Sequence, residues 1–424
     1  MKKILLITFL MISSLFAAVD AKLEIVKKAN SLPKIIVSIS NDTIEINTLT
    51  RIKNLLSKDL EISGHFEIVD IQNIVSFNQS PDFSTLSNDS IDLYLNLSAI
   101  KNLSGGYTLL TKLYDINAQS MVQEKSFTSS QEDRYPFLAH KTAISINDFF
   151  KAPSIKWMEK FVIYSEYSGA GKANIKISDY TLTYKKTIVS GGLNIFPKWA
   201  NNDQKSIYYT SYNYKKPTLV KLNIFNSTKE IIMSSDGMIA CSDVNHDGSK
   251  ILITASPNGQ PDIYSYSLNT KQKVKITNYS GIDVGGQFIE NDNRIVFVSD
   301  RLGSPNIFAK AIKGRGVEKL VYHSRNNSSA TAFNDNIIYS SKDIDNELGT
   351  TTAFNLYLMS TKSDNLKRLT SSGINQFPKF SQDGESLLFI KTFNGISSLG
   401  IMRLNFNKSY LFTSNSGRIQ SIDW

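Results

Sequence analysis

Cysteine and histidine are scarce in this sequence, which contains one cysteine, Cys241, and four histidines. A single cysteine excludes an intrachain disulfide framework, even in an oxidising compartment. The histidines show none of the spacings that bind zinc; they are His65, His140, His246 and His323. We therefore predict no metal site, and we expect Cys241 to be a small buried residue because its neighbours form a predicted strand.

Long hydrophobic runs are absent beyond the N-terminus. The chain begins with "MKK", continues with the apolar run "ILLITFLMISSLF" and then carries small residues. This order is typical of a secretory signal peptide, and the run is too short to span a membrane. We predict a signal peptide over residues 1–21, with cleavage after Ala21 and with Ala17 or Ala18 as alternatives. The mature protein is then expected in a bacterial periplasm.

Runs of like charge are also absent, although the formal net charge is +9. Removal of residues 1–21 would take away two lysines and one aspartate and leave +8. Because the basic residues are scattered, the sequence favours a solvated surface over a nucleic-acid interface. We predict no nucleic-acid partner.

Motifs of catalysis are missing as well. No G-x-S-x-G nucleophile elbow occurs. The segment "DVNHDG" (243–248) imitates the start of a calcium loop, but the twelfth position of that loop would be Thr254 instead of a bidentate acid. We interpret the segment as a hairpin turn, and we predict a non-enzymatic protein without a cofactor.

What the sequence does contain is a repeat of about 45 residues. A glycine, once replaced by asparagine, is followed seven residues later by an aromatic residue or valine. The pairs are Gly192/Trp199, Gly237/Val244, Gly281/Phe288, Asn326/Phe333, Gly373/Phe380 and Gly417/Trp424. Successive pairs start 44 to 47 residues apart, a regularity that indicates structural repeats.

Each repeat has the same internal order. The seventh residue precedes a polar turn such as "NHDGSK", an apolar strand such as "ILITAS", a second strand such as "DIYSYSL" and a basic-apolar strand such as "KVKIT". Four short strands per repeat are typical of a β-propeller blade. We expect the glycine to give a tight turn into the inner strand and the seventh residue to pack between blades.

The two ends of the repeat region predict how the ring closes. Residues 161–190 supply three strands of a blade that lacks its inner strand, and "GRIQSIDW" (417–424) supplies an inner strand with nothing after it. We therefore predict a mainly β fold with a six-bladed β-propeller over residues 158–424, closed by the C-terminal strand. Closure would also remove exposed sheet edges.

Residues 22–150 have a different pattern, which predicts a small α/β domain. Gly64 is placed to end a helix with one apolar face, formed by Leu49, Ile52, Leu56 and Leu60. A half-buried strand is predicted from the alternation of Ile91, Leu93, Leu95 and Leu97. Two hairpin strands and a second helix follow. Residues 22–33 are basic and are expected to form either an N-terminal arm or an edge strand of this domain, and "KAPSIKW" (151–157) is the predicted linker.

This combination resembles the TolB family, the periplasmic β-propeller proteins of the Tol–Pal system. The resemblance covers essentially the whole mature chain. It rests on "LLSKDLEISGHFEIVD" (55–70), similar to the family's leucine-rich helix followed by S-G-x-F, and on "AHK" (139–141). "FPKFSQDGESLLF" (377–389) is similar to the family's blade motif P-x-[WF]-S-x-D-G.

The resemblance implies a scaffold that binds other proteins. Pal, the peptidoglycan-associated lipoprotein, is expected at the propeller mouth, and TolA, an inner-membrane protein, at the N-terminal arm. The implied role is in outer-membrane integrity and constriction at cell division. The residues implied to face Pal are Asn194, Met238, Ile239, Asp283, Val284, Ser328 and Asn375. Those implied to face TolA are Lys22, Leu23, Glu24, Ile25, Val26 and Pro33.

The same resemblance implies a monomer that meets the membrane only through its partners, with other outer-membrane or Tol proteins as further candidates. Two alternatives stay open: a propeller with peptidase- or glycosidase-type activity, and a glycan-binding protein of the envelope. Against the first, no hydrolase domain follows the repeats, and the S-x-D-x-G-x-x-W boxes of sialidases do not occur.

Overall fold

The computed structural model describes residues 32–424, apart from residues 44, 72–73, 325, 343–352, 364, 407 and 415. The chain divides into two compact units: the first holds the residues up to Thr128 and Lys141–Ile155, and the second holds Ser129–His140 and Lys156–Trp424. Unlike the predicted division, this one groups Ser129–His140 with the second unit. The boundaries 22–150 and 151–157 stay predictions. None of the helices in the described ranges is long and apolar enough to cross a membrane.

The first unit is an α/β domain built on a sheet with the strand order β2-β1-β3-β4-β5. Its strands are β1 (Lys34–Ile39), β2 (Glu67–Ile68), β3 (Leu93–Lys101), β4 (Tyr107–Asp115) and β5 (Ser120–Thr128). β1 pairs in parallel with β2 and β3, whereas β3, β4 and β5 form an antiparallel meander. The α-helices are α2 (Ile46–Ser63), α3 (Phe83–Asn88) and α4 (Tyr135–Phe149). Residues of α4 belong to both units.

The apolar face predicted for the first helix is confirmed in α2. All four of its predicted residues are fully buried: Leu49, Ile52, Leu56 and Leu60. Gly64 ends the helix with φ of 77°, a left-handed conformation that favours glycine because it has no Cβ. Its N–H donates to the carbonyl of Glu61 at 3.1 Å.

The prediction of a half-buried strand is wrong for the first half of β3. Its alternate leucines are buried, but Tyr94 and Asn96 between them are buried as well. Tyr94 lies in a cluster with Leu86 of α3 and Tyr114 of β4, so this side of the sheet is also covered. The segment predicted as a linker ends in a short 3-10 helix, η2 (Lys156–Glu159), in which Trp157 is buried.

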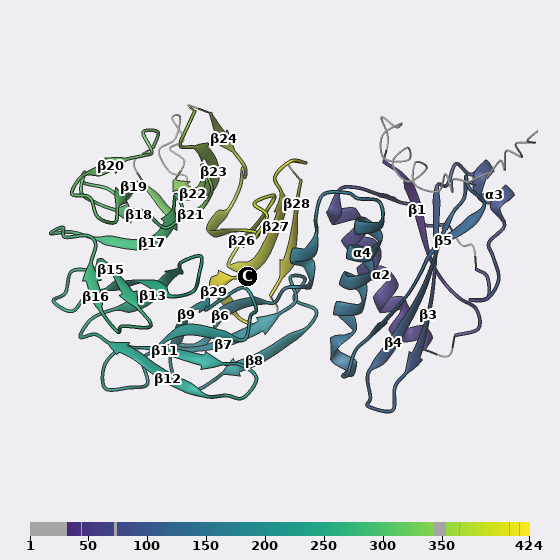
Figure 1. Cartoon of the computed structure of the whole chain (residues 1–424), viewed down its shortest axis with the longest axis horizontal. Coiled ribbons are helices and arrows are strands. Elements are labelled where there is room, and N and C mark those ends of the chain that lie inside the picture. Colours follow the sequence, from purple (N-terminus) through teal and green to yellow (C-terminus); the bar gives the residue numbers. More distant parts are fainter. Residues whose placement is uncertain are drawn as a thin grey trace, which may run out of the picture. The chain divides into compact units, whose positions relative to one another are not determined.

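The sheets of the second unit are built from antiparallel meanders (Figure 1). The first contains β9 (Asn194–Trp199), β10 (Ser206–Ser211), β11 (Thr218–Asn223) and β12 (Lys229–Ser234). The next contains β13 (Ile239–Val244), β14 (Lys250–Ala255), β15 (Asp262–Ser267) and β16 (Lys273–Lys275). A third contains β17 (Asp283–Ile289), β18 (Arg294–Ser299), β19 (Asn306–Ala311) and β20 (Val317–Lys319).

Two further meanders share one larger sheet, joined by a parallel bridge between Phe354 and Ile374. One contains β21 (Asn327–Phe333), β22 (Asn336–Lys342), β23 (Phe354–Ser360) and β24 (Leu366–Arg368). The other contains β25 (Ile374–Phe380), β26 (Ser386–Phe393), β27 (Ile396–Arg403) and β28 (Lys408–Thr413).

The remaining sheet of the second unit joins strands that are far apart in the sequence. Its order is β29-β6-β7-β8, formed by β29 (Arg418–Asp423), β6 (Val162–Gly169), β7 (Lys172–Ser178) and β8 (Lys185–Val189). In Figure 1 the yellow β29 lies beside the teal β6, at the edge of this sheet. The C-terminal strand thus supplies the strand that residues 161–190 lack.

Polar side chains around the buried carboxylate of Glu166 reinforce the pairing of β29 with β6. The hydroxyls of Ser414 and Ser416 donate to Glu166 at 2.9 and 2.8 Å, and Lys176 forms an ion pair with the same carboxylate. Burial alone would raise the pKa of Glu166, but the hydrogen bonds from Lys176 and the two serines outweigh it and lower the pKa. The charged form of Glu166 is therefore favoured where the chain returns from β28 to β29.

The first strands of successive meanders lie against one another. Contacts join β29 with β9, β9 with β13, β13 with β17, β17 with β21, β21 with β25, and β25 with β29. Meanders packed around their first strands are the arrangement of a β-propeller. Each of these strands also shows a register shift against its neighbour, which is a β-bulge or a similar irregularity.

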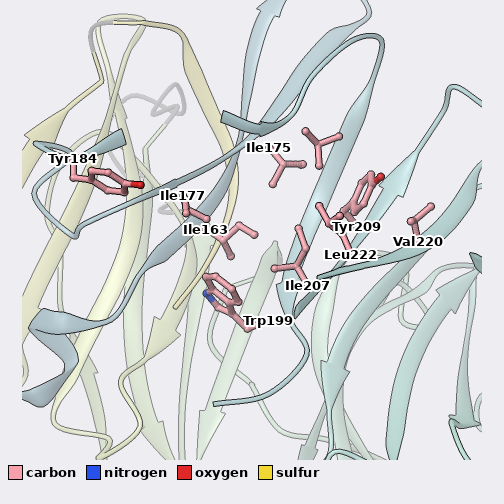
Figure 2. Close-up of a cluster of buried hydrophobic side chains, with 10 residues drawn as sticks. Ile163, Ile175, Ile177, Tyr184, Trp199, Ile207, Tyr209, Val220 and Leu222 are labelled. Atoms are coloured by element: carbon pink, nitrogen blue, oxygen red, sulfur yellow. The ribbon is translucent and has the colours of Figure 1, made fainter. Parts of the chain in front are cut away.

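The predicted roles of the repeat positions hold at two sites. Trp199 packs between sheets, since its cluster includes Ile163 and Ile177 of one sheet and Ile207 and Val220 of the next (Figure 2). The tight turn is found at Gly192, where φ is +67° and an added Cβ would lie 1.7 Å from Oδ1 of Asn213. A larger residue would therefore force this turn to move.

We predict that Trp199→Ala lowers the free energy of unfolding of the second unit by about 3–5 kcal/mol, because the cavity left between the two sheets cannot close. Phe225→Ala is the control, because Phe225 is 72% exposed and its loss should change stability by less than about 0.5 kcal/mol. Urea unfolding followed by circular dichroism measures both. Equal losses would contradict the packing role of Trp199.

Candidate functional site

The candidate site lies along the first strands of the second unit, where two cavities meet. The smaller cavity has a volume of about 360 Å³ and contains three of the residues predicted to face Pal, namely Met238, Val284 and Ser328. Its wall is largely apolar, with Phe196 and Phe377 among its residues. The larger cavity, of about 750 Å³, is lined by the turns that follow the first strands. Lys198 lines both.

The other predicted residues of this set begin the first strands and are buried: Asn194, Ile239, Asp283 and Asn375. Asn194 accepts a hydrogen bond from the hydroxyl of Ser211 at 2.8 Å and donates to the carbonyl of Gly191 at 2.8 Å. Its polar atoms are used within the chain, where they hold the loop that leads into β9.

Asp283 and Asn375 have the same structural character. Both carboxylate oxygens of Asp283 accept from Arg301, at 2.9 and 3.0 Å. The amide of Asn375 donates to the carbonyls of Phe354 and Ser372, each at 2.9 Å. These side chains hold neighbouring loops of the chain in place, and their direct contact with a partner stays a prediction.

The residues predicted to face TolA are almost all outside the described residues: Lys22, Leu23, Glu24, Ile25 and Val26. Pro33 is described, and its carbonyl accepts a hydrogen bond from the N–H of Glu67 at 3.0 Å. The chain is thus fixed to β2 where the predicted arm ends.

A largely buried charge cluster lies where the two cavities meet, and it was not predicted from the sequence. The ammonium nitrogen of Lys198 lies 3.1 Å from Oδ1 of Asp423 and 3.3 Å from Oδ1 of Asp243. Lys379 approaches the same oxygen of Asp423 at 3.9 Å. Two lysines and two aspartates from β9, β13, β25 and β29 therefore meet inside the unit, and their formal charges cancel.

The two aspartates of the cluster also accept hydrogen bonds from backbone N–H groups of the neighbouring first strands. The N–H of Trp199 donates to Oδ2 of Asp423 at 2.9 Å, and the N–H of Phe288 donates to Oδ2 of Asp243 at 2.9 Å. The sixth residue after each repeat start is Lys198, Asp243, Gln287, Ala332, Lys379 or Asp423. The signal that could have revealed the cluster is this sixth position, next to the aromatic position that defined the repeat.

The two lysines differ in electrostatic environment. Burial disfavours the charge on Lys198, but the carboxylates of Asp423 and Asp243 outweigh it and raise the pKa of Lys198. Burial and the nearby charge of Lys198 lower the pKa of Lys379, against the opposing effect of Asp423. Lys198 is thus well paired and Lys379 poorly paired.

Cys241 lies beside this cluster and is buried, as predicted. Burial raises the pKa of its thiol above the ordinary value. Two of the histidines each contact one polar side chain. Nδ1 of His65 lies 2.6 Å from Oδ1 of Asn147, and Nε2 of His140 lies 3.3 Å from Oδ2 of Asp179. Among the described residues, no group of three or more His, Cys, Asp or Glu side chains is placed to hold a metal ion.

Comparison with known proteins gives matches to both units. Residues 21–122 match the model of the TolB amino-terminal domain, and residues 159–424 match that of the TolB beta propeller domain. The chain is 47% identical over 425 residues to the "Tol-Pal system protein TolB" of Wolinella succinogenes, covering 100% of both chains. It is 42% identical over 426 residues to the protein of that name from Campylobacter jejuni, again covering 100% of both chains.

A solved structure, that of TolB from Acinetobacter baumannii, is similar to this one with a TM-score of 0.75. The similarity covers 93% of this chain and 97% of that chain, at 21% sequence identity, and shows the shared fold.

Fold and site together define a β-propeller protein with an N-terminal α/β domain and a charge cluster between two cavities. Both domain matches and the full-length relatives identify its family. The chain belongs to the TolB family and is a component of the Tol–Pal system. The alternatives of a peptidase, a glycosidase or a glycan-binding protein are not favoured.

We predict unequal stability losses for the two lysines. Lys198→Met should lower the free energy of unfolding by about 3 kcal/mol, because Asp243 and Asp423 lose their shared cation. Lys379→Met should cost less than about 1 kcal/mol, because Asp423 keeps Lys198 and the N–H of Trp199. Urea unfolding at pH 7 compares the two variants, and a larger loss for Lys379→Met would contradict the pairing described here.

Proposed function

We propose that this chain is a non-enzymatic scaffold in the periplasm that binds Pal at the smaller cavity and TolA through residues 22–33. Through these two partners it would support outer-membrane integrity and constriction at cell division. The observation that carries the proposal is the position of Met238, Val284 and Ser328, which line one apolar cavity within a TolB-family propeller.

We infer further that the second unit is a six-bladed ring closed by β29. The pairing of β29 with β6 supports this inference, as do the contacts of β29 with β9 and with β25. A closed ring presents a rigid, concave rim of loops. Such a rim can bury a specific interface of about 1,200–2,000 Å².

The TolA contact would depend on the N-terminal arm. A short arm can add a strand to the edge of a partner's sheet, and backbone hydrogen bonds then supply much of the affinity. If free and docked states of the arm differ by only a few kcal/mol, Pal binding could shift their populations. The proposal includes cleavage of residues 1–21, a monomeric state and domain boundaries at residues 150 and 157.

We expect Met238→Arg to weaken Pal binding by about tenfold or more, because the longer side chain would fill the cavity in which the proposed interface is centred. Met121→Arg is the matched control, since Met121 is an exposed residue of β5 in the first unit. Isothermal titration calorimetry with purified Pal from the same organism measures both variants. Unchanged affinity for Met238→Arg would refute this location of the Pal site.

The arm is tested separately by deleting residues 22–33. This deletion should abolish capture of purified TolA and leave Pal affinity unchanged. Loss of both partners, or retention of TolA, would contradict the proposed division between arm and propeller.

A further inference from the structure

The two cavities on either side of the charge cluster carry opposite charge. The larger cavity is lined by five aspartates, namely Asp203, Asp243, Asp247, Asp292 and Asp423. The smaller cavity is lined by Lys198 and Lys379 and by no aspartate or glutamate. Lys198 lines both cavities, whereas Lys379 lines only the smaller, apolar cavity, which is the one proposed to receive Pal.

Lys379 is the less well paired of the two lysines in this cluster. Its nitrogen lies 3.9 Å from Oδ1 of Asp423, which is beyond hydrogen-bond distance, and no other carboxylate of the described residues is within 4 Å. The side chain is only 18% exposed, and it lines the smaller cavity but not the larger one. Burial and Lys198 lower its pKa, so an added anion would relieve an unfavourable charge.

Two segments of identical sequence line the smaller cavity. The tripeptide Phe-Pro-Lys occurs at 196–198 on β9 and again at 377–379 on β25, and both of these first strands contact β29. Phe196 and Phe377 have φ of 54° and 52°, and both line the smaller cavity. A left-handed conformation is costly for an aromatic residue, and such strain is concentrated at binding and active sites.

We propose that the smaller cavity receives a carboxylate side chain of Pal, an Asp or Glu flanked by apolar residues, and that Lys379 is its main partner. This inference rests on the Pal-binding function proposed above. The apolar wall would contact the flanking residues, and the ammonium group would donate a charge-assisted hydrogen bond in a site shielded from water. A cavity of about 360 Å³ has room for such a group. An incoming cation would instead meet two ammonium groups.

The variant that tests this is Lys379→Met, which keeps most of the side-chain volume and removes the charge. We expect it to weaken binding of purified Pal by about tenfold or more in calorimetry at pH 7, because the carboxylate would be buried without a cation. Lys379→Arg should retain most of the affinity. Lys221→Met is the matched control for loss of one positive charge, because Lys221 lines the larger cavity and not the smaller one.

A double-mutant cycle identifies the acidic partner. Each exposed Asp or Glu of Pal is changed to Asn or Gln and titrated against the unmodified chain and against Lys379→Met. One of these changes should weaken binding to the unmodified chain and have little further effect on Lys379→Met. Unchanged affinity of Lys379→Met, or the absence of any coupled acidic residue, would overturn the inference.

The outcomes separate the two proposals. If Met238→Arg abolishes Pal binding while Lys379→Met binds normally, the Pal site stands and the carboxylate inference fails. If the unmodified chain does not bind Pal at all, both fail. Circular dichroism and thermal melting of each variant show that a lost affinity does not come from a lost fold.

Discussion

The structure of the second unit depends on the carboxylate of Asp423, which links β29 to neighbouring first strands. This residue ends β29, and its oxygens accept a hydrogen bond from the N–H of Trp199 and pair with Lys198 on β9. Lys379 on β25 approaches the same oxygen that pairs with Lys198. The indole N–H of Trp424 donates to the carbonyl of Phe380 on β25 at 2.8 Å. The last two residues therefore connect three first strands that are far apart in the sequence.

This arrangement explains why charged residues occupy the interior of a β-rich unit. A buried carboxylate or ammonium is costly unless it is paired and hydrogen-bonded. Here each aspartate also accepts a backbone N–H from the neighbouring first strand, so the charges fix the register between sheets. The same layer lies where an apolar cavity with ammonium groups meets a polar cavity rich in aspartate. Stability and proposed binding thus use the same few side chains.

Much of the fold was predictable, because each repeat encodes its strands locally through alternating apolar residues and polar turns. The pairing of residues 418–423 with the sheet of residues 161–190 was also predictable, because that sheet lacked an inner strand and the last repeat consisted of an inner strand alone. The two-sided burial of β3 was not, since it depends on Leu86 of α3 packing over Tyr94. The charge cluster was missed because its members are about 45 to 225 residues apart, and only the arrangement of the first strands brings them together.

The most direct test of the central role of Asp423 is amide hydrogen exchange in Asp423→Asn, followed by mass spectrometry on the peptide containing residues 417–424. Loss of the carboxylate should accelerate exchange in this peptide by about tenfold or more, because β29 would open locally, while β18 exchanges as before. Asp236→Asn, at an exposed surface ion pair, is the control and should leave both peptides unchanged. Unaltered exchange over residues 417–424 in Asp423→Asn would contradict the account.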